Sequence, residues 1–248
     1  MQPLLSGKRV LVTGGSRGLG RAICQVFARQ GARVAFTYNK NEAAAAEVLE
    51  TIAAEGGQAL AERCSVLDAK GTAALVKRLE ADWGGIDVLV NNAGITQNLP
   101  LALLEEEDWD LVMDTNVKGA FLSSRAVLRG MIRRKEGGVI LTMGSLAGVR
   151  MLEAPIHYCA SKAALVGFSY ALAKEVARYK IRVHCLAPGL LEGGVGIKVP
   201  DHRLKDYLDN CALGRLGTFE EVAELAALMA SDRASYLSGE VVVADGGL

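Results

Sequence analysis

The chain of 248 residues has no excess of either charge, few aromatic side chains and no long apolar run. Its 28 lysines and arginines equal its 28 aspartates and glutamates, and the basic residues are scattered along the sequence. Scattered basic charge provides no surface that would attract nucleic acid or an anionic membrane. Apolar stretches stay below the roughly 18 residues that a membrane-spanning helix needs, and the first residues lack the pattern of an export signal. We therefore expect no nucleic-acid partner and no membrane association.

The cysteines are odd in number, and none forms a Cys-x-x-Cys pair. This spacing argues against a disulfide framework and against a zinc site. We expect no bound metal, and we expect reduced thiols in a cytoplasmic protein. The five cysteines are Cys24, Cys64, Cys159, Cys185 and Cys211.

Short apolar runs alternate along the chain with longer amphipathic segments. This alternation is typical of βαβ units, in which helices cover a parallel sheet. Half of the residues are apolar, and no proline-rich or low-complexity linker divides the chain. The sequence therefore predicts an α/β fold in which residues 1–248 form a single domain, with a doubly wound, Rossmann-type sheet of about seven parallel strands and helices on both faces. Strands are expected at residues 9–13, 33–38, 59–64, 88–90, 138–142, 182–186 and 240–244, and helices at 19–30, 42–55, 70–82, 108–134, 156–179 and 220–231.

A glycine-rich turn follows the first predicted strand and opens a helix. Glycines allow a tight turn, and they let a pyrophosphate approach the free amides at the start of a helix, where the helix dipole also favours an anion. The spacing is G-x-x-x-G-x-G and differs from the G-x-G-x-x-G of the general dinucleotide fold. The alternative is a tight connection without a ligand, but the position after the first strand favours nucleotide binding. The turn reads Thr13-Gly14-Gly15-Ser16-Arg17-Gly18-Leu19-Gly20.

The end of the second strand indicates which nicotinamide nucleotide is bound. An acidic residue at this position accepts hydrogen bonds from the ribose of NAD. None stands here, where the chain reads Tyr38-Asn39-Lys40. Arg17 and Lys40 instead supply positive charge for a 2′-phosphate. We therefore expect NADP(H), with Arg17 as the main contact to the 2′-phosphate. Lys40 either contacts this phosphate or is only a solvated cation of the loop, and the two alternatives are equal.

Polar and small residues follow the fourth predicted strand, in Asn91-Asn92-Ala93-Gly94. They stand at the carboxyl edge of the sheet, where doubly wound folds bind ligands. Asn116 and Gly119 fall within the long helix predicted next, and both residue types cost helix stability. This pattern predicts a local distortion with a role for Asn116, the alternative being an ordinary buried asparagine.

Tyr158 and Lys162 are four residues apart in a predicted helix, so their side chains leave the same face. A free tyrosine titrates near pH 10 and transfers protons poorly near neutrality unless a cation stabilises its phenolate. Lowering that pKa by about three units needs roughly 4 kcal/mol, which a partly desolvated lysine can supply. The hydroxyl of Ser145 would hold the oxygen that is reduced or oxidised. Taken alone, the tyrosine and the lysine also fit an ordinary surface pair.

Together these motifs resemble the classical short-chain dehydrogenase/reductase family over essentially the whole chain. The chain is most similar to the β-ketoacyl-[acyl carrier protein] reductases, through the glycine-rich turn, residues 91–96, 213–217 and 245–247. The resemblance implies a homotetramer that packs partly through two long helices and the C-terminal strand. A hetero-oligomer with a paralogue is the alternative. The resemblance also implies four catalytic roles. Tyr158 would be the general acid, and Ser145 would orient the carbonyl. Lys162 would bind the nicotinamide ribose and lower the pKa of the tyrosine, and Asn116 would support a proton relay through water.

The resemblance also assigns residues to NADP(H). They lie in the glycine-rich turn, after each of the strands that end beside it, and in the predicted catalytic helix. They are Gly14, Ser16, Arg17, Gly18, Leu19, Gly20, Asn39, Ser65, Val66, Asn92, Ala93, Gly94, Tyr158, Lys162, Pro188, Gly189 and Leu191.

Some positions on the substrate side depart from the reductase pattern. Leu190 follows Pro188-Gly189, where the family commonly has a threonine, and His157 and His184 stand where asparagine is common. The side chain of His157 points about 100° away from Tyr158 around the helix, so we expect a role behind the site or at an interface.

The segment from Leu190 to Asn210 is predicted to be a lid over the acyl site. It contains Gly193, Gly194 and Gly196, and then a helix-like run at residues 201–210. Long glycine-containing segments beside a site are typical of lids. The stripe Leu204, Tyr207 and Leu208 would either cover an acyl chain or only pack against the domain.

The leading hypothesis is NADPH-dependent reduction of a β-keto thioester, a 3-oxoacyl group on acyl carrier protein, to the 3-hydroxyacyl thioester in fatty-acid or polyketide biosynthesis. One alternative is a short-chain dehydrogenase for a cyclic, aromatic or CoA-linked alcohol or ketone. Another is a catalytically silent partner subunit of a hetero-oligomeric ketoreductase, which the complete catalytic set argues against. A basic patch would suit an acidic carrier protein, although the same residues also fit cations at helix C-termini. The patch consists of Arg129, Arg133, Arg134, Lys135, Arg178 and Lys180.

Overall fold

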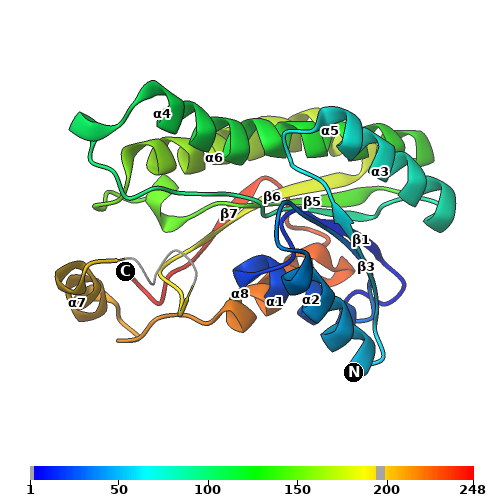
Figure 1. The fold of residues 1–248 in the computed structure, drawn as a ribbon. Helices are drawn as coiled ribbons and strands as arrows, with labels where there is room; N and C mark the ends of the chain where they lie inside the picture. The colour runs from blue at the N-terminus through cyan, green and yellow to red at the C-terminus, as the bar shows by residue number, and fades with distance from the viewer. Residues whose placement is uncertain (1–2, 194–198) are drawn as a thin grey trace.

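The computed structural model describes residues 3–193 and 199–248 of the chain (Figure 1). Seven parallel strands form one sheet, which confirms the predicted doubly wound architecture. The chain order reverses between the first and fourth strands, and the crevice at the carboxyl ends of these strands is where such sheets bind ligands. The order across the sheet is β3 (Gln58–Arg63), β2 (Arg33–Tyr38), β1 (Arg9–Val12), β4 (Val88–Asn91), β5 (Gly138–Met143), β6 (Ile181–Pro188) and β7 (Glu240–Ala244).

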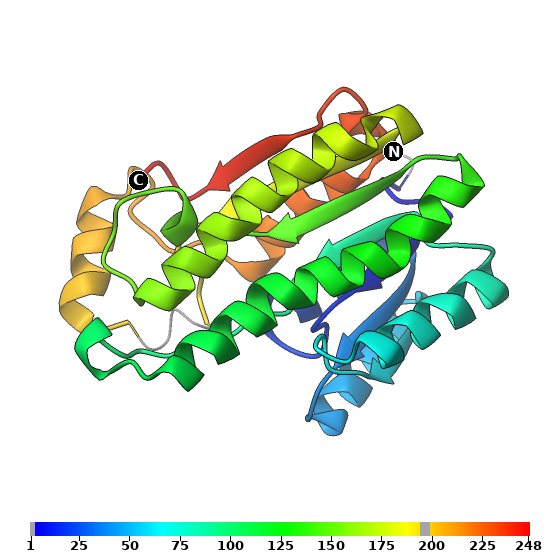
Figure 2. The same ribbon diagram turned by 90° about the horizontal axis from the view of Figure 1, so that it is seen from above.

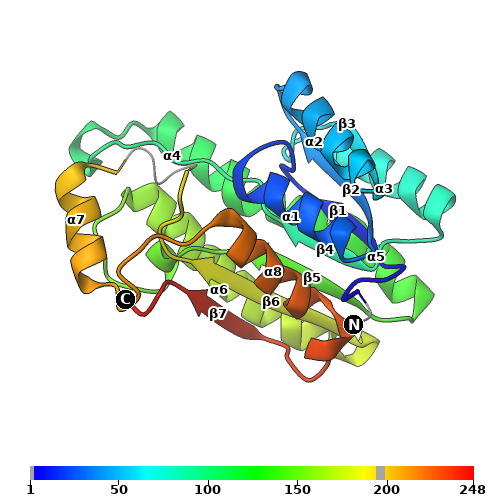
Figure 3. The same cartoon turned by 90° about the horizontal axis from the view of Figure 1, so that it is seen from below.

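Helices cover both faces of the sheet (Figure 1). One face carries α1 (Gly18–Arg29), α2 (Glu42–Ala54) and α8 (Phe219–Ala230), as Figure 3 shows. The other face carries α3 (Ala69–Trp83), α5 (Gly119–Arg134) and α6 (Ile156–Val176), which are in front in Figure 2. The two remaining helices, α4 (Glu106–Met113) and α7 (Asp201–Asn210), lie at one end of the molecule.

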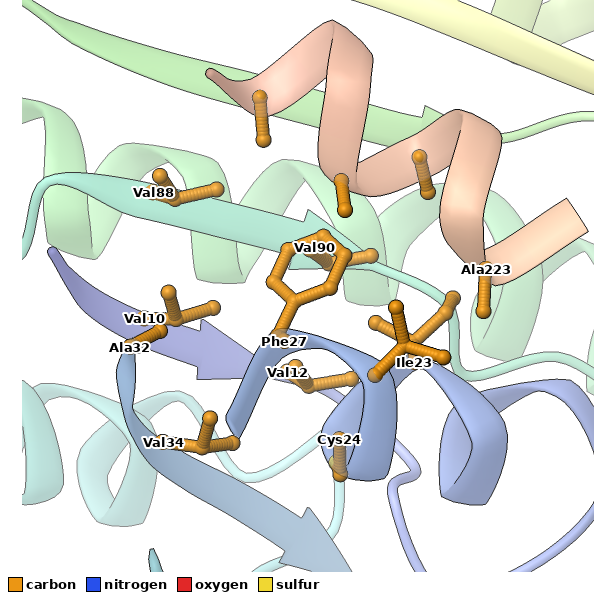
Figure 4. Close-up of a cluster of buried hydrophobic side chains, with 14 of the residues drawn as sticks. Val10, Val12, Ile23, Cys24, Phe27, Ala32, Val34, Val88, Val90 and Ala223 are labelled. Atoms are coloured by element: carbon orange, nitrogen blue, oxygen red, sulfur yellow. The ribbon is translucent and has the colours of Figure 1, made fainter. Parts of the chain in front are cut away.

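Successive strand residues point alternately into two apolar cores, because the side chains of a strand alternate between its faces. In β1, Val10 and Val12 pack in the core beneath α1 and α8 together with the fully buried Phe27 (Figure 4). Leu11 belongs to the core on the opposite face, with residues of α3 and α5 such as Leu79. Truncating a buried side chain of this size to alanine costs about 2–5 kcal/mol, so the two cores hold the carboxyl edge of the sheet as a firm platform.

The helix predicted over residues 108–134 is interrupted. After α4 comes a π-helical turn, η2 (Asp114–Lys118), and α5 begins directly after it. Such turns are rare inside helices and are frequent at functional sites. The distortion predicted around Asn116 is therefore confirmed, whereas the prediction of one continuous helix is wrong. Within residues 3–193 and 199–248, no helix is long and apolar enough to cross a bilayer.

Candidate active site

The ends of β1 and β4 are locked together at the crevice. The Oγ1 of Thr13 accepts hydrogen bonds from the backbone N–H groups of Asn92 (3.0 Å) and Ala93 (3.1 Å). In return, Nδ2 of Asn92 donates to the carbonyl oxygens of Thr13 and Gly14, each at 3.0 Å. The side chain of Asn92 therefore fixes the loop after β4 against the glycine-rich turn.

Glycine is required in this turn by close backbone contacts. A Cβ atom on Gly20 would lie 2.1 Å from the carbonyl oxygen of Gly14, and a Cβ on Gly14 would lie 3.0 Å from the Cα of Ala93. Gly14 also has a φ of +71°, which disfavours other residues. The backbone of the turn is therefore packed tightly against itself. Because glycine has no side chain, the backbone amides at these positions stay accessible to a ligand.

The start of α1 differs from the starts of α2, α3 and α8. The side chains of Asn41, Asp68 and Thr218 accept hydrogen bonds from the first turns of α2, α3 and α8. At the start of α1, Arg17 makes no side-chain capping bond, and the first turn contains no acidic residue. Free amides and the positive end of the helix dipole remain there. The turn and the helix start therefore fit the diphosphate of a dinucleotide.

The adenosine end of the crevice is lined by cations. The side chains of Arg17, Asn39 and Lys40 are exposed around the end of β2. Within the described residues, neither Arg17 nor Lys40 has a carboxylate within ion-pair distance. Such unpaired charge matches a phosphate better than it matches the two hydroxyls of an NAD ribose.

Two predicted adenosine contacts, Ser65 and Val66, follow β3 at the same edge of the sheet. The carbonyl of Ser65 accepts a hydrogen bond from the N–H of Asp68. The Cγ2 of Val66 would lie 2.8 Å from a Cβ on Gly119, so Val66 packs directly against the first residue of α5. The absence of a side chain at Gly119 lets the loop after β3 approach the π-helical turn.

Asn116 is almost fully buried in the π-helical turn and binds two other segments. Its Oδ1 accepts from the N–H of Ile95 (2.8 Å), and its Nδ2 donates to the carbonyl of Ile95 (3.0 Å). The same Nδ2 donates to the hydroxyl of Ser161 (2.9 Å), which donates in turn to the carbonyl of Tyr158 (2.8 Å). Asn116 thus joins the loop after β4 to the helix that carries Tyr158 and Lys162.

Lys162 is buried, and its Nζ donates to the carbonyl oxygen of Met143 at 2.7 Å. Burial lowers the pKa of this ammonium to about 8. A Cβ placed on Gly94 would lie 3.2 Å from Oδ1 of Asn116 and 3.7 Å from Nζ of Lys162. The loop after β4, the π-helical turn and α6 therefore bring these three residues around one space.

Ser145 and Tyr158 meet beside Lys162. Burial raises the pKa of the Tyr158 phenol, and a hydrogen bond with the Ser145 hydroxyl lowers it in part. The prediction that Lys162 lowers this pKa is wrong for this arrangement, because Nζ lies 5.5 Å from the centroid of the tyrosine ring and donates to Met143 instead. The phenol is therefore protonated at neutral pH.

The chain is similar to known proteins over its full length. The model of the family described as Enoyl-(Acyl carrier protein) reductase matches residues 14–248. The chain is 37% identical to 3-oxoacyl-[acyl-carrier-protein] reductase FabG of Chlamydia muridarum, with 100% of both chains covered, and 37% identical to the protein of that name from Escherichia coli, with 98% of this chain and 97% of that one covered. The chain belongs to the short-chain dehydrogenase/reductase family.

Solved structures of this family match equally fully. A short-chain dehydrogenase/reductase from Serratia marcescens is 32% identical, with a TM-score of 0.91 and 98% of both chains covered. A short-chain type dehydrogenase/reductase from Mycobacterium marinum is 34% identical, with a TM-score of 0.89 over 99% of this chain and 96% of that one. The protein is an NADP(H)-dependent oxidoreductase that interconverts CH–OH and C=O groups.

The segment after β6, where this member of the family has leucine in place of threonine, is held from several sides. The N–H of Gly189 donates to the carbonyl of Ala244, and a Cβ on Gly189 would lie 2.2 Å from the Tyr207 hydroxyl. Leu191 pairs with Gly217 in an isolated parallel bridge and packs half-buried against the core beneath α8. Gly189 and Leu191 therefore have packing partners of their own beside their predicted cofactor contacts.

The predicted lid is described only in part, since Gly194 and Gly196 lie outside the described residues. Its helix is present as α7, and Tyr207 anchors it: the hydroxyl accepts from the N–H of Leu190 and donates to the carbonyl of Asp245, both at 3.1 Å. Arg203 of the same helix forms an ion pair with Glu153, in the segment before α6. Tyr207 thus packs against the domain, and Leu204 and Leu208 of the same predicted stripe are half-buried.

Both unusual histidines are fully buried inside the chain. Within the described residues, neither ring nitrogen of His157 has a hydrogen-bond partner, and burial lowers its pKa. The Nε2 of His184 lies 2.9 Å from Nη1 of Arg182, and burial followed by that positive charge lowers the pKa of His184 to about 4. Both rings are therefore neutral at pH 7, and His157, buried within the chain, offers no exposed surface to an interface.

The sequence did not reveal the residues that hold the site together. Ser161 connects Asn116 to Tyr158 through hydrogen bonds. The sequence indicates this role only by placing a small polar residue one turn after Tyr158, on the same face of the helix. Ile95 and Met143 contribute through their backbone atoms, which any residue carries. No residue type could have identified those two positions.

Proposed function

We propose that the protein uses NADPH to reduce a 3-oxoacyl thioester on acyl carrier protein to the 3-hydroxyacyl thioester, in fatty-acid biosynthesis. The observation that carries this proposal is the arrangement of Asn116, Ser145, Tyr158 and Lys162 around one space at the carboxyl edge of the sheet. Full-length similarity to two proteins named 3-oxoacyl-[acyl-carrier-protein] reductase supports the substrate class.

In this proposal the residues along the crevice would hold the cofactor. The amides at the start of α1 bind the diphosphate, and Arg17 binds the 2′-phosphate. Lys162 uses one N–H for Met143 and keeps two for the nicotinamide ribose, so it need not leave its carbonyl partner. When bound, NADPH supplies the hydride that reduces the carbonyl carbon.

Ser145 and Tyr158 act on the carbonyl oxygen. The Oγ of Ser145 accepts a bond from the N–H of Ala147 (3.2 Å), and its O–H, which hydrogen-bonds with Tyr158 in this structure, would turn to donate to the substrate. Tyr158 carries its proton at neutral pH because burial raises its pKa, as a general acid for reduction requires. Its Oη gives that proton to the carbonyl oxygen. The ammonium of Lys162, whose pKa is about 8, is mostly charged at pH 7 and keeps its bond to the carbonyl of Met143.

Tyr158 must then regain a proton. Both N–H groups of the Asn116 amide are already donated, to Ile95 and to Ser161. Its Oδ1 accepts one bond and has a second lone pair, on the side where Gly94 leaves space. A water relay at Asn116 would therefore use this lone pair, and the main contribution of Asn116 is to hold the loop after β4 against α6.

We also propose a homotetramer in the cytoplasm. The apolar side chains of Phe121 on α5 and Tyr170 on α6 are 45% and 49% exposed, and Val243 is exposed on β7, which supports packing through those elements. All five cysteines are free thiols.

Two residues of the predicted basic patch are already paired with carboxylates at the C-terminus of a helix. Arg133 pairs with Glu80 and Arg134 with Asp87, and both lie in the last turn of α5. That helix is 16 residues long, about 24 Å, and it begins beside the site. Its basic end is therefore remote from the site.

The substrate class is tested by comparing kcat/KM for acetoacetyl pantetheine thioester and for cyclohexanone, with NADPH consumption as the readout. We expect an advantage of about tenfold or more for the thioester, because each 1.4 kcal/mol of remote binding energy is worth a factor of ten. Equal or better turnover of cyclohexanone would overturn the proposal in favour of a dehydrogenase for cyclic substrates.

The acyl site is tested with thioesters of increasing chain length. Leu204→Ala should reduce the preference for longer acyl chains if the apolar stripe of α7, on which Leu204 is half-buried, covers the substrate. Leu228→Ala is the matched control, since Leu228 is exposed on α8. Equal chain-length profiles for both variants would contradict a role of α7 in covering the substrate.

A further inference from the structure

Arg63 is the last residue of β3 and lies opposite Tyr38 in the register with β2. Glu62, just before it, forms an ion pair at 2.7 Å with Arg78 of α3. Because neighbouring strand residues point to opposite faces, Arg63 points to the face that carries α1 and α2. The glycine-rich turn opens α1 on this same face (Figure 3).

The guanidinium of Arg63 is held beside the loop that follows β2. Its Nε donates to the carbonyl oxygen of Asn39 at 3.3 Å. Within residues 3–193 and 199–248, its two terminal nitrogens have neither a hydrogen-bond partner nor an ion-pair partner. Four of the five N–H groups of the guanidinium are therefore free, in the planar fork that suits a phosphate.

Arg63 shares this corner with two other unpaired cations. The N–H of Gly15 donates to the carbonyl of Thr37 at 2.9 Å, which ties the turn that contains Arg17 to the end of β2. Lys40 follows Asn39 directly and is exposed. Arg17, Lys40 and Arg63 thus surround the ends of β1, β2 and β3, which are adjacent strands.

The carboxylates near this corner do not neutralise it. Glu47 is paired with Arg21 at 2.5 Å, and Glu62 is paired with Arg78. Glu42, in the first turn of α2, forms no ion pair with the three cations in the described part of the chain. The corner therefore presents positive charge to an anion of roughly two charges, such as a phosphomonoester.

We infer that Arg63 contacts the 2′-phosphate of NADP(H) and is a second determinant, beside Arg17, of the preference for this nucleotide over NAD(H). The inference rests on the proposed function only for the identity of the cofactor. Its geometric basis is the bond to Asn39, which holds the fork at the end of β2 where the ribose of a dinucleotide lies in this fold.

The test measures dissociation constants without any keto substrate. Titrations of wild type, Arg63→Gln and Arg78→Gln with NADPH, with NADH and with adenosine 2′,5′-bisphosphate would follow the fluorescence of the nicotinamide or of the protein. Arg78→Gln is the matched control, because it removes the same charge beside β3 from an arginine that is already paired. Arg63→Gln should weaken NADPH and the bisphosphate by roughly threefold to tenfold and leave NADH within twofold.

Two results would overturn the inference. An equal loss for NADPH and NADH would mean that Arg63 only supports the loop at Asn39, and an unchanged NADPH affinity would mean that it does not reach the phosphate. A failure to reduce keto thioesters would leave these binding results unaffected, so it would refute the proposed function alone.

Discussion

The side of the crevice formed by β1, α1 and β2 offers backbone amides and exposed cations, whereas the side formed by β4, η2 and α6 consists of buried side chains bonded to one another. On the first side, Arg17 and Lys40 have no partner among the described residues, and the start of α1 has no side-chain cap. On the second side, Asn116 and Lys162 are buried and hydrogen-bonded to fixed backbone positions. The nucleotide side thus leaves its groups free for a ligand, while the reaction side is assembled in advance.

The largest expected effect lies on the reaction side. Tyr158→Phe keeps the ring and removes the proton that is transferred, so kcat should fall by about 10²–10⁴-fold. The dissociation constant of NADPH should stay within a few-fold of wild type. Steady-state kinetics with the best thioester and a nucleotide titration measure both quantities; near-normal turnover would show that another group is the acid.

Asn116→Ala should be strongly destabilising, because it leaves the part-buried N–H and C=O of Ile95 without their partners and removes one of the two bonds of the buried Ser161 hydroxyl. Each such group costs about 1–3 kcal/mol, so the free energy of unfolding should fall by roughly 3–5 kcal/mol. Asn210→Ala, which removes only exposed bonds at the end of α7, should stay within about 0.5 kcal/mol. Urea denaturation of the two variants gives both values, and similar losses would show that the network at Asn116 contributes little.

Lys162 should make stability depend on pH. Its pKa in the folded protein is about 8, below the ordinary 10.5, so the cost of burying its charge is complete below pH 8 and is relieved as the pH rises to 10.5. Relative to Lys162→Met, wild type should therefore gain up to about 3 kcal/mol in free energy of unfolding across this window. Urea denaturation at pH 7.5 and at pH 10 measures the gain.

The exposed Lys174 serves as the control, since Lys174→Met should differ from wild type by the same amount at both pH values. If the difference in free energy of unfolding between wild type and Lys162→Met were also the same at both pH values, the lowered pKa of Lys162 would be contradicted.

The smallest of these effects belongs to the nucleotide side. Arg17→Ala should weaken NADPH by about tenfold and leave NADH nearly unchanged, because one exposed charge-assisted contact to phosphate is lost. Equal dissociation constants for NADPH and NADH in the unaltered protein would refute the predicted preference.

The sequence predicted the seven parallel strands and the residues of both sides of the crevice, because glycine spacing and helical periodicity are local properties. It did not predict the chain that leads from Asn116 through Ser161 to Tyr158, since residues 45 apart in the sequence meet there. It also misjudged the tyrosine pKa: spacing placed Lys162 beside Tyr158, but only the structure shows that the ammonium binds the carbonyl of Met143.

Arg63 was absent from the predicted cofactor residues for a related reason. It stands on an edge strand between Glu62 and Cys64, and nothing in that segment marks it as a ligand. The parallel register of β3 with β2 brings it to Asn39, and register cannot be read from one strand alone.

The most direct test of the contrast between the two sides is a double-mutant cycle on NADPH binding. Dissociation constants would be measured for wild type, Arg17→Ala, Tyr158→Phe and the double variant. Arg17 acts through its free charge at the adenosine end, and Tyr158 belongs to the preassembled reaction side. The changes that the two substitutions cause in the free energy of NADPH binding should therefore add within about 0.5 kcal/mol. A coupling energy above about 1 kcal/mol would show that the two sides do not act independently and would contradict the account.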